Sequence, residues 1–210
     1  MMTRSEPADF FELQFQRQVR ESDFALNPFE QLALPYVAGN VLDLGCGLGN
    51  LSLEAARRGC RVTAVDASPT AIERLRAAAR HEQLPLAALQ AELACYRIEG
   101  EFDTVVAIGL LMFLRKEHAL SLLRQIERRV RAGGRAIVNV LVEGTTYLKM
   151  FKRDEFYLFG ANELEQAFAG WTRLVTRHDS FPAPENTRKE FTTVIVQKAQ
   201  CPQTGDRAPD

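Results

Sequence analysis

The ten residues from Val41 to Asn50, with the sequence VLDLGCGLGN, constrain the fold of this chain more than any other stretch. The first four residues, 41–44, are apolar enough for a buried strand. The glycines at 45, 47 and 49 then remove Cβ atoms from the turn that follows. Such a turn between a strand and a helix lets a ligand lie against bare main chain, near the positive end of the helix dipole. The stretch therefore predicts a ligand-binding strand–turn–helix unit.

The spacing of these glycines separates two kinds of nucleotide site. A dinucleotide-binding turn has the pattern Gly-x-Gly-x-x-Gly, and here its third glycine would fall on Asn50. The run is instead Asp-x-Gly-x-Gly-x-Gly, with Asp43 two residues before the first glycine. A carboxylate there repels a pyrophosphate but attracts a ligand that brings an ammonium group and no phosphate. S-adenosylmethionine (SAM) is such a ligand, and a nicotinamide-dependent oxidoreductase is disfavoured.

At this point the chain resembles the class I SAM-dependent methyltransferases, whose first motif reads very like residues 43–49. The resemblance extends over roughly residues 35–198, because strand and helix patterns alternate with short connections and a hairpin follows. It implies an α/β fold: a doubly wound, mostly parallel, seven-stranded Rossmann-like sheet with an antiparallel C-terminal hairpin and helices on both faces. The expected strands are 41–44, 61–65, 86–90, 102–108, 135–141, 172–181 and 191–197.

The chain divides into a short N-terminal segment, one domain and a tail. Its 210 residues, 46% of them apolar, suffice for one core. We expect a helical segment over 1–34, the methyltransferase domain over 35–198 and a disordered tail over 199–210. Within the first segment, 9–20 has a helical stripe of Phe10, Leu13, Phe15 and Val19. This helix fits either a lid over a pocket or an element docked on the core, and docking is the favoured interpretation.

Composition disfavours several classes of partner. The net charge of −1, without a run of Lys and Arg, lacks the basic excess that recruits nucleic acid. The absence of a signal peptide and of a membrane-spanning apolar run predicts a cytoplasmic protein with no membrane partner. The four cysteines show no CxxC pair or other metal-ligand spacing, so no metal is expected. A small molecule is the expected substrate.

Acidic residues at two further strand ends complete the predicted cofactor site. Asp66 lies 17 residues beyond Gly49, at the tip of the second strand, where a parallel sheet brings it beside the glycine turn to hold the ribose diol. In the family, an acid after the third strand accepts from the adenine amino group, and Glu92 takes this position. The predicted cofactor-binding residues are Asp43, Gly45, Cys46, Gly47, Asn50, Asp66, Ala67, Glu92, Leu93 and Ile108. Cys46 has no partner base in the sequence and reads as a small packing residue.

Three further features are similar to the TehB-type tellurite methyltransferases. They are Glu92-Leu93 followed by Tyr96, the apolar run 110–114, and Phe156 with Phe159 ahead of Gly170-Trp171. The loop before the last strand lacks the His-Arg pair of typical members and offers Arg188 and Lys189 instead. The resemblance implies a small soft or anionic acceptor such as tellurite, selenite or a thiol. Its predicted contacts are Met112, Phe156 and Arg188.

The run 110–114 also bears on mechanism, because it holds no ionisable residue where many superfamily members place a base. A soft or pre-ionised nucleophile needs only alignment with the SAM methyl group, whereas an alcohol or amine needs a base. His81, His118 and His178 read as solvated side chains, so the sequence leaves the catalytic residues unknown. Two alternatives stay open: O- or N-methylation of another small metabolite, and a module that binds SAM without turnover.

Overall fold

The structure, a computed structural model, describes residues 6–21, 24–151 and 155–200, with side chains from residue 11 onward. The predicted tail lies outside the described residues from position 201 onward, and so do residues 1–5 of the N-terminal segment. Within the described part of the chain, no helix is long and apolar enough to cross a membrane.

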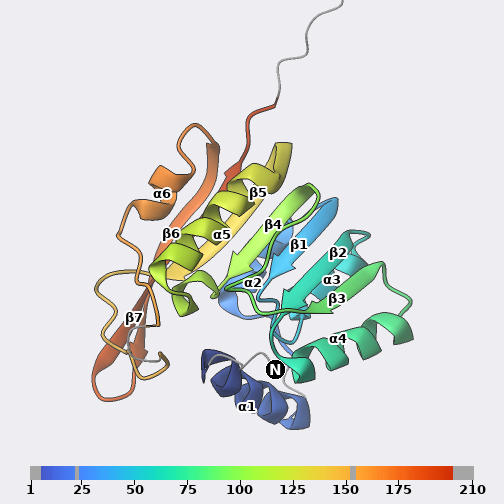
Figure 1. Ribbon diagram of the computed structural model, residues 1–210, viewed down its shortest axis with the longest axis horizontal. Helices are drawn as coiled ribbons and strands as arrows, with labels where there is room; N and C mark the ends of the chain where they lie inside the picture. The colour runs from blue at the N-terminus through green and yellow to red at the C-terminus, as the bar shows by residue number, and fades with distance from the viewer. Residues whose placement is uncertain (1–5, 22–23, 152–154, 201–210) are drawn as a thin grey trace, which may run out of the picture.

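A seven-stranded sheet in the order β3-β2-β1-β4-β5-β7-β6 forms the centre of the molecule (Figure 1). The strands from β3 to β5 in this order run parallel, whereas β7 is antiparallel to β5 and β6. The predicted doubly wound sheet with a C-terminal hairpin is therefore confirmed. The strands are β1 (Asn40–Leu44), β2 (Arg61–Asp66), β3 (Leu86–Gln90), β4 (Phe102–Ile108), β5 (Val130–Leu141), β6 (Thr172–Ala183) and β7 (Thr187–Gln197).

Helices cover both faces of the sheet, and alternate strand residues feed two hydrophobic clusters. In β1, Leu42 and Leu44 pack toward α5 and α6, whereas Val41 packs toward α2, α3 and α4. The helices are α1 (Glu6–Glu21), α2 (Pro28–Ala33), α3 (Asn50–Arg57), α4 (Pro69–His81), α5 (Lys116–Arg129) and α6 (Glu163–Ala167), with 3₁₀ turns η1 (Leu34–Tyr36) and η2 (Leu111–Phe113).

The starts of β5 and β7 differ from the predicted strands by more than two residues. The fifth strand begins at Val130 and not at 135, because Val130 is buried and pairs with Phe102 on β4. Gly134 follows inside this strand, where a Cβ would lie 2.8 Å from the main-chain oxygen of Asp103. The final hairpin is also tighter than expected, with Glu185 and Asn186 at φ values of 60° and 56° in its turn.

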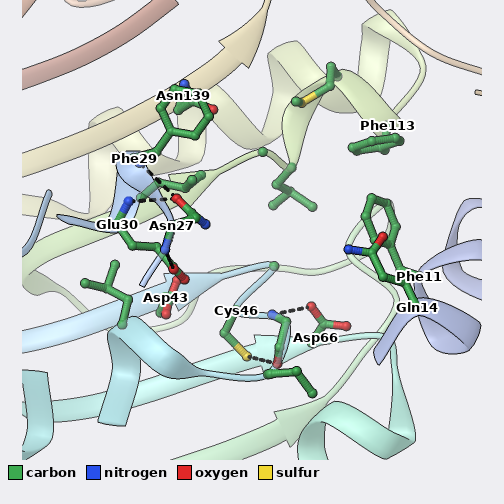
Figure 2. A pocket seen from close by; sticks show the side chains of 18 of the residues that line it. Phe11, Gln14, Asn27, Phe29, Glu30, Asp43, Cys46, Asp66, Phe113 and Asn139 are labelled. Carbon is green, nitrogen blue, oxygen red and sulfur yellow. Dashed lines mark hydrogen bonds between the residues drawn. The ribbon is translucent and has the colours of Figure 1, made fainter. Parts of the chain in front are cut away.

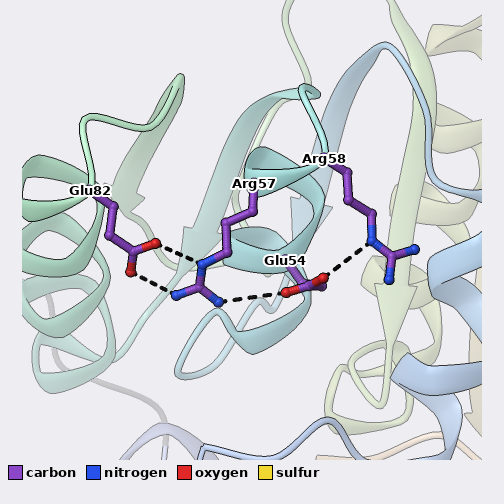
Figure 3. A network of polar contacts seen from close by, with 4 residues as sticks. All are labelled: Glu54, Arg57, Arg58 and Glu82. Atoms are coloured by element: carbon purple, nitrogen blue, oxygen red, sulfur yellow. Dashed lines mark hydrogen bonds and ion pairs between the residues drawn. The ribbon is translucent and has the colours of Figure 1, made fainter.

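The two helices that follow β1 and β2 begin at the sheet edge where the site lies, and a charged network links their far ends (Figure 3). The Arg57 guanidinium on α3 makes two hydrogen bonds of 2.7 Å to the carboxylate of Glu82, just beyond α4. Glu54 pairs with both Arg57 and Arg58. These side chains are partly exposed to solvent, so the network orients the ends of the helices while adding little stability.

Candidate active site

A cavity of about 390 Å³ lies at the carboxyl edge of the central strands, the edge that α1 crosses in Figure 1. Ligands of doubly wound sheets bind at this edge because the turns after the strands open there. Every residue of the predicted cofactor set lines the cavity, and so does Met112. The structure thus brings together residues that are spread from 43 to 112 along the chain; their roles in binding stay predictions.

The glycine turn is anchored to the neighbouring strand by its main chain. The N–H groups of Gly45 and Cys46 donate to the carbonyl of Val65 at 2.8 and 3.1 Å. The N–H of Gly47 donates to Asp66 Oδ2 at 2.9 Å, and the N–H of Ser68 donates to Oδ1 at 2.8 Å. Asp66 thus already accepts main-chain hydrogen bonds, but a carboxylate has about four acceptor sites, so it keeps capacity for a ligand.

Asp43 is a buried carboxyl in the wall of the cavity, with only 5% of its surface exposed. Burial raises its pKa to about 7, although the Ser52 hydroxyl, which donates to Oδ2 at 2.6 Å, opposes the shift. Burial likewise raises the pKa of Glu30, whose Oε2 accepts from the N–H of Asn27 at 2.8 Å. Figure 2 shows Asn27, Glu30 and Asp43 side by side. A cationic group in this part of the cavity would stabilise the charged form of both carboxyls.

The charge and hydrogen-bonding capacity of the lining fit SAM. Among the described lining residues, the carboxyls are Glu30, Asp43, Asp66 and Glu92, and the one basic side chain is Lys189. Asn50 and Asn139 also line the cavity, and the buried amide oxygen of neither has a hydrogen-bond partner among the described residues. SAM offers an ammonium group, ribose hydroxyls and an adenine amino group as donors, and it carries no phosphate for the carboxylates to repel.

One face of α1 lines the cavity while the same helix packs on the domain, so the structure is compatible with both the lid and the docked-helix interpretation. The lining residues are Phe11, Gln14, Phe15 and Gln18, whereas Leu13 is 69% exposed. Their spacing of three, four and seven positions was the signal in the sequence, because these positions share one helix face. The Phe11 ring meets that of Phe113 edge-on at 4.8 Å, and Glu12 Oε2 accepts from Ser68 Oγ at 2.5 Å.

Two predicted substrate contacts lie outside the cavity lining. Side chains of a strand alternate between faces, so on β7 Lys189 and Phe191 line the cavity while Arg188 points elsewhere. The side chain of Arg188 is 65% exposed, with Nη1 3.7 Å from Glu190 Oε1. Phe156 stacks on Phe151 at a ring separation of 4.6 Å, and Phe151 in turn packs on the lining residue Phe113. Among the described residues, Lys189 and not Arg188 is therefore the cation that lines the cavity.

Among the described lining residues there is no histidine, and the groups that could act as a base are the carboxyls of Glu30, Asp43, Asp66 and Glu92. His81, His118 and His178 are exposed and do not line the cavity. Cys46 lines it, but burial raises the pKa of its thiol well above the ordinary value, which disfavours the nucleophilic thiolate. Cys46 therefore has the packing environment that the sequence suggested.

A doubly wound sheet with an acidic, glycine-rich turn at its carboxyl edge is the fold of the class I SAM-dependent methyltransferases. The family model for a methyltransferase domain matches residues 41–134, which run from β1 into the start of β5. This match, together with the fold and the acidic glycine-rich turn, makes the described domain similar to the SAM-dependent methyltransferases.

Individual relatives agree with this class. The chain is 27% identical over 165 residues to the probable SAM-dependent methyltransferase TehB of Haemophilus influenzae, covering 75% of this chain and 57% of that protein. It is 32% identical over 140 residues to the carboxy-S-adenosyl-L-methionine synthase of Vibrio parahaemolyticus, covering 63% and 57%. The crystal structure of Haemophilus influenzae TehB aligns with a TM-score of 0.72 at 21% identity, covering 91% of this chain and 67% of that chain. The chain spans about half the length of the curated relatives it matches.

Proposed function

We propose that this domain transfers the methyl group of SAM to a small, soft or anionic acceptor such as tellurite, selenite or a thiolate. The observation that carries the proposal is a single cavity that joins the predicted cofactor residues to an apolar wall and one lysine. SAM supplies a methyl group on a sulfonium, and the acceptor lone pair takes this methyl group as the C–S bond breaks toward sulfur. The chain itself has to hold both partners in line and exclude water.

The wall beside the predicted methyl position supports an acceptor that needs no base. Leu110, Met112, Phe113 and Leu114 line it, and none of them ionises. The exposed histidines lie elsewhere. A thiolate or chalcogen oxyanion arrives already nucleophilic, whereas O- or N-methylation of a neutral metabolite asks for a positioned base. The soft acceptor is therefore preferred over those alternatives.

Lys189 gives this end of the cavity its positive charge. Burial lowers the pKa of its ammonium, which lies 4.9 Å from the centroid of the Tyr147 ring. Its neighbour Arg188 is exposed and outside the lining. A half-buried ammonium attracts a small anion more strongly than a solvated guanidinium does, because less water screens the interaction.

The test uses these two neighbouring cations as a matched pair. We measure methyl transfer from labelled SAM to tellurite, selenite and 2-mercaptoethanol, and SAM affinity by calorimetry. Lys189→Ala lowers kcat/KM for the acceptor about tenfold, or ~1.4 kcal/mol, without changing SAM affinity, whereas Arg188→Ala leaves both unchanged. Equal effects of the two substitutions would remove Lys189 from the site. Binding of SAM with no product from any acceptor would favour the non-catalytic or different-substrate alternatives.

A further inference from the structure

The most deeply buried unpaired group in the cavity is the side-chain amide of Asn139 on β5. Asn139 is 0% exposed, and its Nδ2 donates to Thr193 Oγ1 on β7 at 2.8 Å. Its Oδ1 has no hydrogen-bond partner among the described residues, although the residue lines the cavity. A buried acceptor left unpaired destabilises a folded protein, so its retention in a cavity wall points to a ligand that supplies the missing donor.

The register of the sheet places this amide beyond the cofactor residues. Asn139 pairs with Ile108 on β4 and with Thr193 on β7. Ile108 is the outermost member of the predicted cofactor set, and adjacent strands lie about 4.8 Å apart. Asn139 is thus one strand further out, on the side of the cavity that Phe191 and Lys189 also line. Figure 2 shows Asn139 and Phe29 at one end and Cys46 and Asp66 at the other.

We propose that Asn139 is a specificity-determining residue whose Oδ1 accepts a hydrogen bond from the methyl acceptor. The inference rests on the proposed function and narrows its substrate class. The acceptor carries an O–H or N–H donor next to its soft nucleophilic atom, as a hydroxythiol, hydrogen selenite or hydrogen tellurite does. A buried polar group rejects an analogue that lacks the matching donor, because the group is then left unpaired.

The experiment compares two thiols of nearly the same size, 2-mercaptoethanol and 1-propanethiol, which differ by a hydroxyl in place of a methyl group. The parent protein prefers 2-mercaptoethanol at least tenfold in kcat/KM. Asn139→Leu, which keeps the volume and removes the acceptor, reduces this preference to within twofold while SAM affinity stays unchanged. A second readout is the side-chain NH₂ resonance of Asn139. With S-adenosylhomocysteine present, it shifts with 2-mercaptoethanol but not with 1-propanethiol.

Asn50, at the start of α3, provides the matched control in another part of the cavity wall. Its Oδ1 is also buried and unpaired among the described residues, but Asn50 belongs to the predicted cofactor set. Asn50→Leu weakens SAM binding and leaves the preference between the thiols intact. Should Asn139→Leu fail to fold, Asn139→Leu combined with Thr193→Val removes both hydrogen-bonding partners and replaces them by apolar groups of similar shape.

The outcomes separate the inference from the function on which it rests. Turnover of both thiols with equal kcat/KM, or a preference that survives in Asn139→Leu, overturns the role of Asn139 while methyl transfer to soft acceptors stands. Binding of SAM without turnover of any thiol, selenite or tellurite overturns the proposed function and this inference with it.

Discussion

Gly47 is restricted in two ways. Its main-chain conformation disfavours other residues, and a side chain at this position would meet helix α1. Its φ is +52°, and a Cβ would lie 3.1 Å from the Phe15 ring of α1. Gly59 is restricted only by its main-chain conformation, because its φ is +91° and no atom lies within 4 Å of the Cβ position. An L-residue in this left-handed region costs roughly 1–2 kcal/mol. Comparing the same substitution at Gly47 and at Gly59 therefore separates main-chain strain from steric obstruction of the cavity.

We expect Gly47→Ala to raise the Kd for SAM at least fivefold, about 1 kcal/mol, because the new methyl group pushes on Phe15 and narrows the cavity. Gly59→Ala should lower the free energy of unfolding by about as much as Gly47→Ala but bind SAM like the parent. Calorimetry and urea unfolding measure the two quantities. A Kd for Gly47→Ala within about twofold of the parent, or ~0.4 kcal/mol, would mean that this glycine only forms the turn.

At the scale of elements, α1 is held across the open edge of the sheet by a small number of specific contacts. Glu12 is buried at 8% exposure and accepts hydrogen bonds from Ser68 and Thr70 at the start of α4. On the same helix, Arg17 and Glu21 form a solvated pair with 64% and 60% exposure. The buried contact fixes the helix over the glycine turn, whereas the solvated pair contributes little.

Glu12→Ala should therefore loosen α1 and speed the dissociation of SAM roughly fivefold, an effect of about 1 kcal/mol. Arg17→Ala, on the solvated face of the same helix, should leave the dissociation rate unchanged. Stopped-flow displacement of SAM by excess S-adenosylhomocysteine gives the rate for each variant. Identical rates in the two variants would show that α1 does not retain the cofactor.

For the molecule as a whole, the acidic cavity lowers stability at neutral pH. The folded protein holds the pKa of Asp43 at about 7 through burial, whereas an aspartate in an unfolded chain has a pKa of about 3.9. Between these values the folded state keeps a proton that the unfolded state has released. The free energy of unfolding therefore falls as the pH rises toward 7, by at most on the order of 4 kcal/mol for this one group.

The corresponding prediction concerns the pH profile of stability. Asp43→Asn stays neutral, so its free energy of unfolding should rise relative to that of the parent between pH 5 and pH 7, and the difference should level off above pH 8. Urea unfolding of both proteins at each pH measures this difference. Asp179→Asn, a substitution outside the cavity lining, serves as the control. A difference between Asp43→Asn and the parent that does not change with pH would refute the buried, raised-pKa state of Asp43.

The sequence alone determined the order of strands and helices and the residues at the predicted cofactor site. These follow from local patterns: apolar runs of strand length, the glycine spacing of 45–49, and acids at strand ends. Because parallel strands end at the same edge of a sheet, residues such as Asp43, Asp66 and Glu92 had to meet once the strand order was right.

Only the tertiary structure determined which residues line the part of the cavity near β5 and β7. It selected Lys189 over the adjacent Arg188, because the pairing of β7 with β5 and β6 fixes which face each strand residue presents. It also turned α1 toward the glycine turn and left the oxygen of Asn139 unpaired beside Thr193, a residue 54 positions away. These outcomes depend on register and packing between distant segments, which no local pattern of apolar and polar residues encodes.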